Sequence, residues 1–306
     1  MSKRAGPQVT RREFIGGGVI AGVGALLAPR AAAALAREQL ITRAIPSSGE
    51  ELPAIGIGTD SFRADVSDEI RAELKRMTEL GGSVIDTAAA YGESEALIGQ
   101  ALESLGTREK MFLATKLVGS GGAESLERSL QRFKTRRIDL LQVHNLNGIA
   151  ELVPLMQQWK KAGTIRYIGA TTSRGSQHEE LMSAMRTYPL DFIQVDYSLD
   201  NREAAAGILP LALARKQAVL VNLPFGRSSL FSEAAGRKLP QWAADIDVSS
   251  WAQYFLKYVI SHPVVTCVIP GSTKVSHLED NQAAGRGRLP DAAMRRKMEE
   301  YWDNKS

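Results

Sequence analysis

Eight short apolar runs recur along the chain at a nearly constant interval, and this periodicity restricts the fold more than any other feature. The runs start near Ile55, Ser83, Met111, Ile138, Ile165, Asp191, Ala218 and Val264. Most starts lie about 27 residues apart, which is the length of one strand, one helix and their loops. Eight such units predict an α/β protein of the (β/α)8 TIM-barrel type, with residues 37–306 forming one domain.

The segments between the runs have helical periodicity. Ile70, Leu74 and Met77 share one stripe, Ser67 is expected to cap its start and Gly81 to stop it. Similar stripes follow the second and third runs, and we interpret all of them as core. The interval between the seventh and eighth runs is longer, which is typical of a loop that binds a ligand.

Chemically useful residues stand at the ends of three successive runs. Asp86 ends the second run and Tyr91 follows it closely, Lys116 ends the third, and His144 ends the fourth. In a barrel the carboxyl ends of the strands share one face, and that face carries the active site. We therefore expect these four side chains to converge.

This set of side chains suits proton transfer from a phenol. A free phenol has a pKa of about 10 and is a poor acid near neutrality, unless a cation such as Lys116 favours the phenolate. A carboxylate, Asp86, keeps the lysine charged and oriented. His144 can hydrogen-bond the oxygen that Tyr91 protonates.

Several segments then resemble the aldo-keto reductase family, in the order in which the family has them. They are Asp86–Glu95, Leu52–Thr59, Ala114–Lys116, Asp139–His144 and Val268–Ser272. The resemblance runs from about Leu52 to the C-terminus. It implies an NAD(P)H-dependent oxidoreductase that reduces a small aldehyde or ketone to an alcohol by hydride transfer, with Tyr91 as general acid and Asp86, Lys116 and His144 as its catalytic partners.

The resemblance also implies a dinucleotide site. Its expected cofactor-binding residues are Thr59, Thr171, Thr172, Gln194, Asn222, Leu223, Pro224, Gly226, Arg227, Gly271, Ser272, Thr273, Lys274, His277, Asp280 and Asn281. Gln194 matches the family's carboxamide-binding glutamine. The loop from Pro224 to Ser229 is expected to fold over the pyrophosphate, and the short loop from Leu117 to Gly122 to leave the substrate mouth open.

Five positions of this site depart from the family pattern. The usual Ser-Asn pair after the fifth strand is Thr171-Thr172, and Asn222 stands where a tyrosine commonly stacks on the nicotinamide. Gly271 replaces a lysine and His277 an arginine. Lys274 or Arg286 is left to contact a 2′-phosphate, so NADPH is the expected cofactor and NADH stays open.

Residues 1–36 have the pattern of a twin-arginine signal peptide. Arg11-Arg12 is followed by Phe14 and Ile15, and then by an apolar stretch of about 14 residues, short of the ~20 that span a bilayer. An Ala-x-Ala site ends at Ala36, so cleavage would start the mature chain at Arg37. We expect export to the periplasm by the twin-arginine machinery, with no stable membrane anchor afterwards.

Charge and composition argue against a nucleic-acid-binding protein and against a metal site. Residues 1–36 hold five of the 38 basic and one of the 34 acidic side chains, which leaves 33 of each and no electrostatic footprint for nucleic acid. Cys267 is the single cysteine and is expected to pack as a small hydrophobe. The four histidines lack ligand spacing, so we expect no metal site.

Two other functions stay open at this stage. One is an exported nucleotide-binding or redox-sensing barrel with negligible turnover, which the departures at Thr172 and Asn222 leave possible. The other is an unrelated barrel hydrolase or lyase that uses the same carboxylate and histidine without a dinucleotide. Hydride transfer to a carbonyl distinguishes the reductase from both.

Overall fold

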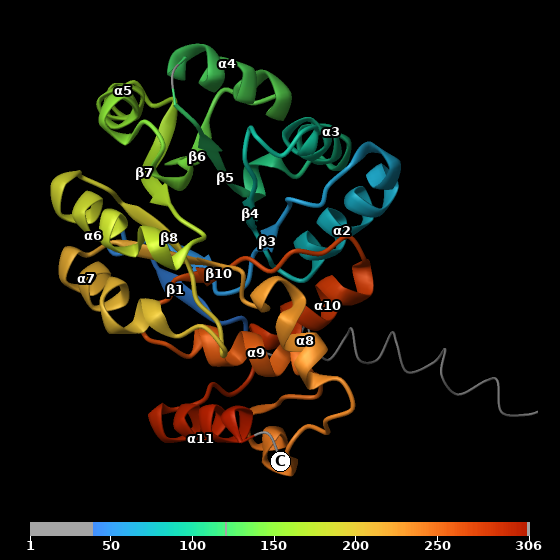
Figure 1. Cartoon of the computed structure of the whole chain (residues 1–306). Helices are drawn as coiled ribbons and strands as arrows, with labels where there is room; N and C mark the ends of the chain where they lie inside the picture. The colour runs from blue at the N-terminus through green and yellow to red at the C-terminus, as the bar shows by residue number, and fades with distance from the viewer. Residues whose placement is uncertain (1–38, 120, 305–306) are drawn as a thin grey trace, which may run out of the picture. The chain divides into compact units, whose positions relative to one another are not determined.

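Eight parallel strands form a closed barrel in the computed structural model, which describes residues 39–119 and 121–304 (Figure 1). The strands are β3 (Ile57–Gly58), β4 (Val84–Asp86), β5 (Phe112–Leu117), β6 (Ile138–Val143), β7 (Ile165–Thr171), β8 (Phe192–Asp196), β9 (Ala218–Asn222) and β10 (Cys267–Val268). Neighbours in sequence are neighbours in the sheet. Parallel bridges from Ile55 to Val268 and from Gly58 to Gly271 close the first strand against the last. The predicted (β/α)8 barrel is confirmed.

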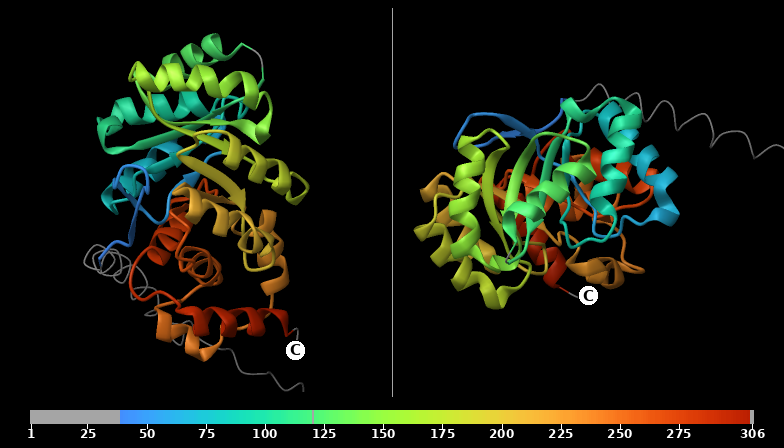
Figure 2. Two further views of the ribbon diagram at one scale, coloured as in Figure 1. Left: turned by 90° about the vertical axis from the view of Figure 1, so that its left-hand side faces the viewer. Right: turned by 90° about the horizontal axis from the view of Figure 1, so that it is seen from above.

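Helices surround the strands, as Figures 1 and 2 show. They are α2 (Ser67–Glu79), α3 (Ser94–Leu105), α4 (Gly122–Phe133), α5 (Ile149–Lys161), α6 (His178–Thr187), α7 (Ile208–Arg215), α8 (Ser229–Ala234), α9 (Trp251–Ile260), α10 (Val275–Ala284) and α11 (Ala292–Asp303). Ile70, Leu74 and Met77 are buried, as their spacing predicts. The expected cap at Ser67 is wrong, because Val66 is the cap position and Ser67 is already the first helical residue.

Two apolar cores stabilise the barrel. One lies between the strands and the helices and holds most of the helical stripes. The other includes Phe112 of β5, Tyr167 of β7 and Phe192 of β8, whose ring centroids are 5.5 to 5.9 Å apart. Cys267 belongs to the second core and is fully buried, which confirms its expected packing as a small hydrophobe.

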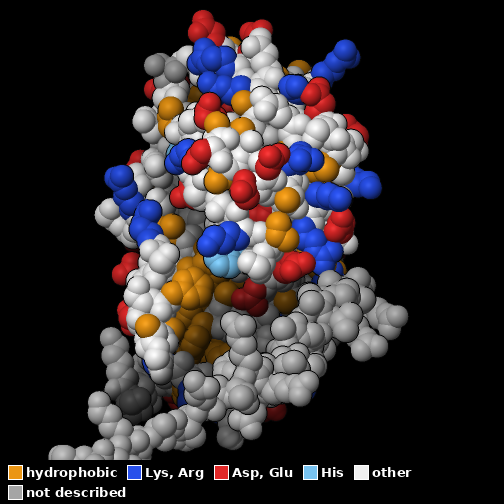
Figure 3. All heavy atoms as spheres, turned by 90° about the vertical axis from the view of Figure 1, so that its right-hand side faces the viewer, with side chains coloured by type: hydrophobic (Ala, Val, Ile, Leu, Met, Phe, Trp, Pro, Cys, Tyr) orange, Lys and Arg blue, Asp and Glu red, His pale blue; other side chains and the backbone are white. Residues whose placement is uncertain are grey.

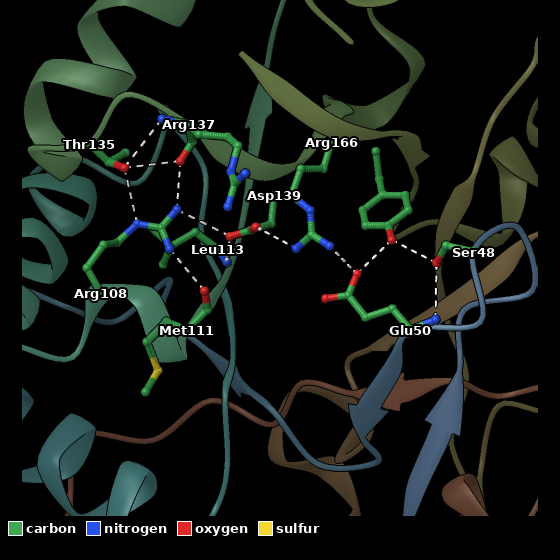
Figure 4. Close-up of polar contacts among 10 residues, drawn as sticks. Ser48, Glu50, Arg108, Met111, Leu113, Thr135, Arg137, Asp139 and Arg166 are labelled. Atoms are coloured by element: carbon green, nitrogen blue, oxygen red, sulfur yellow. Dashed lines mark hydrogen bonds and ion pairs between the residues drawn. The ribbon is translucent and has the colours of Figure 1, made fainter. Parts of the chain in front are cut away.

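A hairpin of β1 (Thr42–Ala44) and β2 (Glu51–Pro53) precedes the barrel, and Ile45 and Leu52 extend the second core. The sequence pattern does not predict it, because strands of three residues carry too little periodicity. Polar contacts tie its turn to the barrel (Figure 4). Glu50 accepts from Arg166 and from the Tyr167 hydroxyl at 2.7 Å, while Arg166 also pairs with Asp139 at 2.9 Å.

The connection between β9 and β10 is the longest βα segment, as expected from the sequence. It contains α8, a 3-10 helix (Gln241–Ile246) and α9. Trp251 of α9 stacks on Phe255 with centroids 5.5 Å apart, and Phe255 packs edge-on against Trp302 of α11. These rings hold the long connection against the C-terminal helix. By contrast, only a short turn separates β5 from α4.

Candidate active site

Asp86, Tyr91, Lys116 and His144 converge, as their places at strand ends predict. Asp86 is the last residue of β4, Tyr91 lies in the turn before α3, Lys116 belongs to β5, and His144 directly follows β6. All four line one cavity of about 560 Å³ at the carboxyl ends of the strands. The barrel therefore brings them to the face where active sites of this fold lie.

Lys116 and Asp86 form a buried ion pair at the bottom of the cavity. The Nζ to Oδ2 distance is 2.5 Å, both side chains are at most 3% exposed, and Nζ also donates to the Thr87 carbonyl at 2.7 Å. Amide groups of Gln142 and Gln194 donate to the same carboxylate at 3.2 and 3.5 Å. Burial raises the pKa of Asp86, and the Lys116 ammonium opposes this rise. Four donated hydrogen bonds thus fix the lysine and the carboxylate in place.

The Tyr91 phenol lies between the Lys116 ammonium and the His144 ring. The Nζ atom is 5.1 Å from the phenol centroid, and the imidazole meets the phenol edge-on with centroids 5.9 Å apart. Burial raises the pKa of Tyr91, Lys116 lowers it and Asp86 raises it again, so the net pKa is above the ordinary value. The cation acts in the expected direction, but burial outweighs it in the protein alone.

His144 is a neutral imidazole at physiological pH. Burial, together with the charge of Lys116, lowers its pKa to about 4. Its Nδ1 atom is buried and has no hydrogen-bond partner among the described residues. The next residue, Asn145, has φ of 51°, and its backbone N–H donates to Thr171 Oγ1 at 3.1 Å. This strained turn fixes the imidazole beside the phenol without charging it.

Two buried amide oxygens leave acceptor positions open in the wall of the cavity. Gln194 Oε1 and Asn222 Oδ1 have no partner among the described residues, although both side chains line the cavity. Their nitrogens are engaged, because Gln194 donates to Asp86 and Asn222 donates to the Thr172 carbonyl at 3.0 Å. A buried acceptor without a donor is costly, so these oxygens fit a ligand that carries amide N–H groups.

The expected threonines take different positions. Thr59 and Thr171 line the cavity, and Thr59 also donates to the Asp86 carbonyl at 3.0 Å. Thr172 is outside its lining, because the hydroxyl donates to Gln177 Oε1 at 2.9 Å instead. Thr172 therefore supports the turn after β7 and offers its carbonyl to Asn222.

The loop after β9 contributes Leu223, Pro224 and Arg227 to the cavity, as predicted. Leu223 and Arg227 have φ of 49° and 54°, a conformation that non-glycine residues rarely adopt. Gly226 does not line the cavity. Its φ is 55°, in the region that favours glycine, and a Cβ there would lie 2.2 Å from Ser229 Oγ, so a larger residue would displace the Ser229 side chain.

The segment after β10 forms the far arm of the site. Gly271, Ser272, Thr273, Lys274 and His277 line the cavity, which confirms that they lie together. Arg286, the other candidate for a phosphate contact, does not line this cavity. Its side chain is 5% exposed and donates to the carbonyl of Leu80. Arg286 thus points into the interior, and Lys274 is the candidate that faces the site.

Asp280 and Asn281 line a second cavity of about 510 Å³. It shares Phe225, Ser228, Gly271 and His277 with the first, so the two cavities are adjacent. Ser250 and Gln253 donate to the Asp280 carboxylate at 2.7 and 2.6 Å. Figure 3 shows hydrophobic side chains gathered beside a histidine on this side of the molecule.

Sequence reasoning missed several residues that shape the site. Gln142 is one, although it stands two residues before His144 on β6 and so shares its side of the strand. The cavity lining also includes Gly58, Asp60, Ser61, Asn145, Ser173, Phe225, Ser228 and Ile269, and the second cavity adds Phe231 and Trp251. Most of these lie within three residues of a strand end, which is the signal that could have found them.

Two features are absent from residues 39–119 and 121–304. No group of three or more histidine, cysteine or acidic side chains there is arranged to hold a metal ion. Within the same ranges, no helix has the length and apolar character needed to cross a bilayer.

Solved structures with the same fold include two aldo-keto reductases. The enzyme from Klebsiella pneumoniae in complex with NADPH superposes with a TM-score of 0.74 at 23% identity, over 86% of this chain and 96% of that one. The holo form of AKR11C1 from Bacillus halodurans superposes with a TM-score of 0.72 at 24% identity, over the same shares of the two chains. At these identities the likeness shows the fold.

Sequence comparison shows the family. Methylglyoxal reductase YeaE of Escherichia coli K12 is 31% identical over 267 residues, which cover 82% of this chain and 92% of that protein. The model of the Aldo/keto reductase family matches residues 54–300. This span includes all eight barrel strands and the four converging side chains. The chain therefore belongs to the aldo/keto reductase family, and it is an oxidoreductase.

Proposed function

We propose that this protein reduces an aldehyde or ketone to an alcohol with NADPH, and that Tyr91 donates the proton. The observation that carries the proposal is the convergence of the phenol, the buried Lys116–Asp86 pair and the neutral His144 in one cavity. When bound, NADPH supplies the hydride that the carbonyl carbon accepts. The protein supplies the proton and holds the carbonyl oxygen.

The site residues fit a nicotinamide dinucleotide. The unpartnered oxygens of Gln194 and Asn222 match the carboxamide N–H groups, and Arg227 and Lys274 are cations for its phosphates. NADPH is preferred because the related Klebsiella pneumoniae enzyme is described in complex with NADPH, and because Lys274 can pair with a 2′-phosphate. The second cavity would take the adenosine end.

Each of the four converging side chains has a separate role in proton transfer. The Tyr91 hydroxyl gives its proton to the carbonyl oxygen, and the Lys116 ammonium stabilises the phenolate that remains. Asp86 positions Lys116 through the 2.5 Å ion pair. His144, being uncharged, orients the carbonyl by a hydrogen bond and leaves the proton to the phenol.

The test is Tyr91→Phe, assayed by NADPH oxidation with a panel of aldehydes and ketones. We expect the turnover to fall by about 10² to 10⁴, because general acid catalysis contributes that much. The dissociation constant of NADPH should stay near that of the wild type. Tyr188→Phe is the matched control, because Tyr188 lies outside both cavities. Full activity in the Tyr91 variant would rule out the phenol as proton donor.

Cofactor choice is tested by fluorescence titration of the protein with NADPH and NADH separately. Micromolar binding of NADPH, weakened by Lys274→Ala while NADH binding is unchanged, would support Lys274 as the 2′-phosphate contact. Equal effects on both cofactors would assign Lys274 to a shared phosphate instead. Binding of neither cofactor would contradict the reductase proposal and favour a barrel without turnover.

Export by the twin-arginine pathway is the second part of the proposal. It rests on Arg11-Arg12 and the apolar stretch of residues 1–36, which lie outside the described residues. Replacing both arginines by lysine should retain the protein in the cytoplasm. N-terminal sequencing of the exported form should start at Arg37. An unchanged distribution between compartments after the double substitution would contradict this route.

A further inference from the structure

Asp60 occupies a position in the cavity that the proton-transfer mechanism does not use. It follows Thr59 in the turn after β3 and lines the same cavity as Tyr91 and His144. After burial, Lys116 and Asp86, its charge is the next influence on the pKa of Tyr91, and it raises that pKa. The Asp60 carboxylate therefore lies close enough to the phenol for its charge to change the pKa of Tyr91.

The neighbouring loop after β10 locates the Asp60 carboxylate more closely. A Cβ built on Gly271 would lie 3.6 Å from Asp60 Oδ1. Gly271 belongs to the loop after β10, and it pairs with Gly58 of β3 across the closure of the barrel. The Asp60 side chain thus stands at the rim between the phenol and this loop, facing the cavity.

The Asp60 carboxylate forms no ion pair within the described part of the chain. The neighbouring Arg63 guanidinium donates to the backbone carbonyls of Asp60 and Phe62 at 2.7 and 2.8 Å. It forms no ion pair with the Asp60 carboxylate, and no other described side chain pairs with that carboxylate. A carboxylate without an ion-pair partner at the edge of a cavity attracts cationic ligands and repels anionic ones.

The other described side chains that line the cavity form no ion pair with the Asp60 carboxylate. Lys116 is paired with Asp86, and His144 is neutral above a pH of about 4. Ser61 and Asn145, which also line the cavity, are polar but uncharged. The cations that line the cavity, Arg227 and Lys274, come from the loops assigned to the cofactor phosphates. Among the described residues that line the cavity, Asp60 is therefore the one acidic side chain without an ion-pair partner.

We propose that Asp60 is a specificity-determining residue that selects carbonyl substrates by charge. It favours substrates with a cationic group near the carbonyl and disfavours those with a carboxylate or phosphate. This inference rests on the proposed reductase function. A unit charge about 6 Å away, at an effective dielectric constant of about 40, changes binding by about tenfold. Salt weakens the effect because the rim is open to solvent.

The test compares Asp60→Asn with the wild type on three benzaldehydes that differ in charge at the 4-position. They are the neutral 4-nitro, the anionic 4-carboxy and the cationic 4-trimethylammonio compounds. Each result is the ratio of kcat/KM in the variant to that in the wild type, because this ratio cancels the intrinsic reactivity of each aldehyde. We expect the ratio for the anion to be about tenfold above the ratio for the nitro compound, and the ratio for the cation to be about tenfold below it. Any effect of Asp60 on the acidity of Tyr91 is common to all three aldehydes, so the comparison with the nitro compound removes it.

The control is Asp65→Asn, which removes an exposed carboxylate from the same connection outside the cavity. It should leave all three ratios near one. Equal ratios for the three aldehydes in Asp60→Asn would overturn the charge-selection proposal. So would a change in NADPH affinity that accounts for the whole effect, because Asp60 would then act on the cofactor. Failure of the wild type to reduce any of the aldehydes would instead count against the reductase function.

Discussion

Lys116→Met is expected to destabilise the protein because it leaves the Asp86 carboxylate buried without its cation. Both side chains are at most 3% exposed, and the ion pair is 2.5 Å long. Removing one partner of such a pair costs about 3 to 5 kcal/mol, since the remaining charge has lost its compensation. At roughly 2 to 4 °C per kcal/mol for a domain of similar size, Tm should fall by roughly 6 to 20 °C.

The double variant Asp86→Asn/Lys116→Met separates the charge from the packing. It removes both charges and keeps an amide within reach of Gln142 and Gln194, which now donate to Asp86. We therefore expect it to be more stable than Lys116→Met, although both lack activity. Thermal unfolding followed by circular dichroism measures the difference.

The loss of stability in Lys116→Met should also depend on pH. Burial raises the pKa of Asp86, and the variant has lost the cation that opposes this rise. A carboxyl whose folded pKa is raised contributes stability below its unfolded pKa of about 3.9, and this stability is lost as the pH rises through the folded pKa. The deficit relative to the wild type should thus be small near pH 4 and grow toward pH 8. A deficit below about 1 kcal/mol at pH 8, or one independent of pH, would refute the reasoning.

Three further predictions follow from local geometry. His144 should titrate by NMR with a pKa near 4, and a value near the ordinary 6.5 would show that burial does not hold it neutral. Gly99→Ala should cost about 1 to 3 kcal/mol in thermal unfolding, because its Cβ would lie 2.2 Å from the Arg132 carbonyl, whereas the exposed Gln100→Ala should be neutral. Tyr167→Phe removes the hydroxyl that donates to Glu50 and should cost about 1 kcal/mol while kcat stays unchanged; lost activity would mean that this network reaches the active site.

Periodicity was enough to predict the barrel. Each βα unit is a local pattern of about 27 residues, and the closed arrangement follows once eight of them are counted. The convergence of the four side chains was predictable for the same reason, since Asp86, Lys116 and His144 stand at strand ends and Tyr91 follows one closely. The β1–β2 hairpin was missed because its strands are three residues long, and the cap at Ser67 was wrong because a 3-10 turn (Ala64–Val66) precedes the helix.

The amino-acid sequence by itself determined which chemical groups the site contains, because strand ends on one face must meet. Only the tertiary structure decided their states. Gln194 is 108 residues from Asp86 along the chain yet hydrogen-bonds its carboxylate, and Asp60 reaches the same cavity from the turn after β3. Whether Tyr91 is a stronger or weaker acid than free tyrosine depends on burial against the charge of Lys116, and here burial prevails. Desolvation is set by everything that surrounds a group, so no local pattern records it.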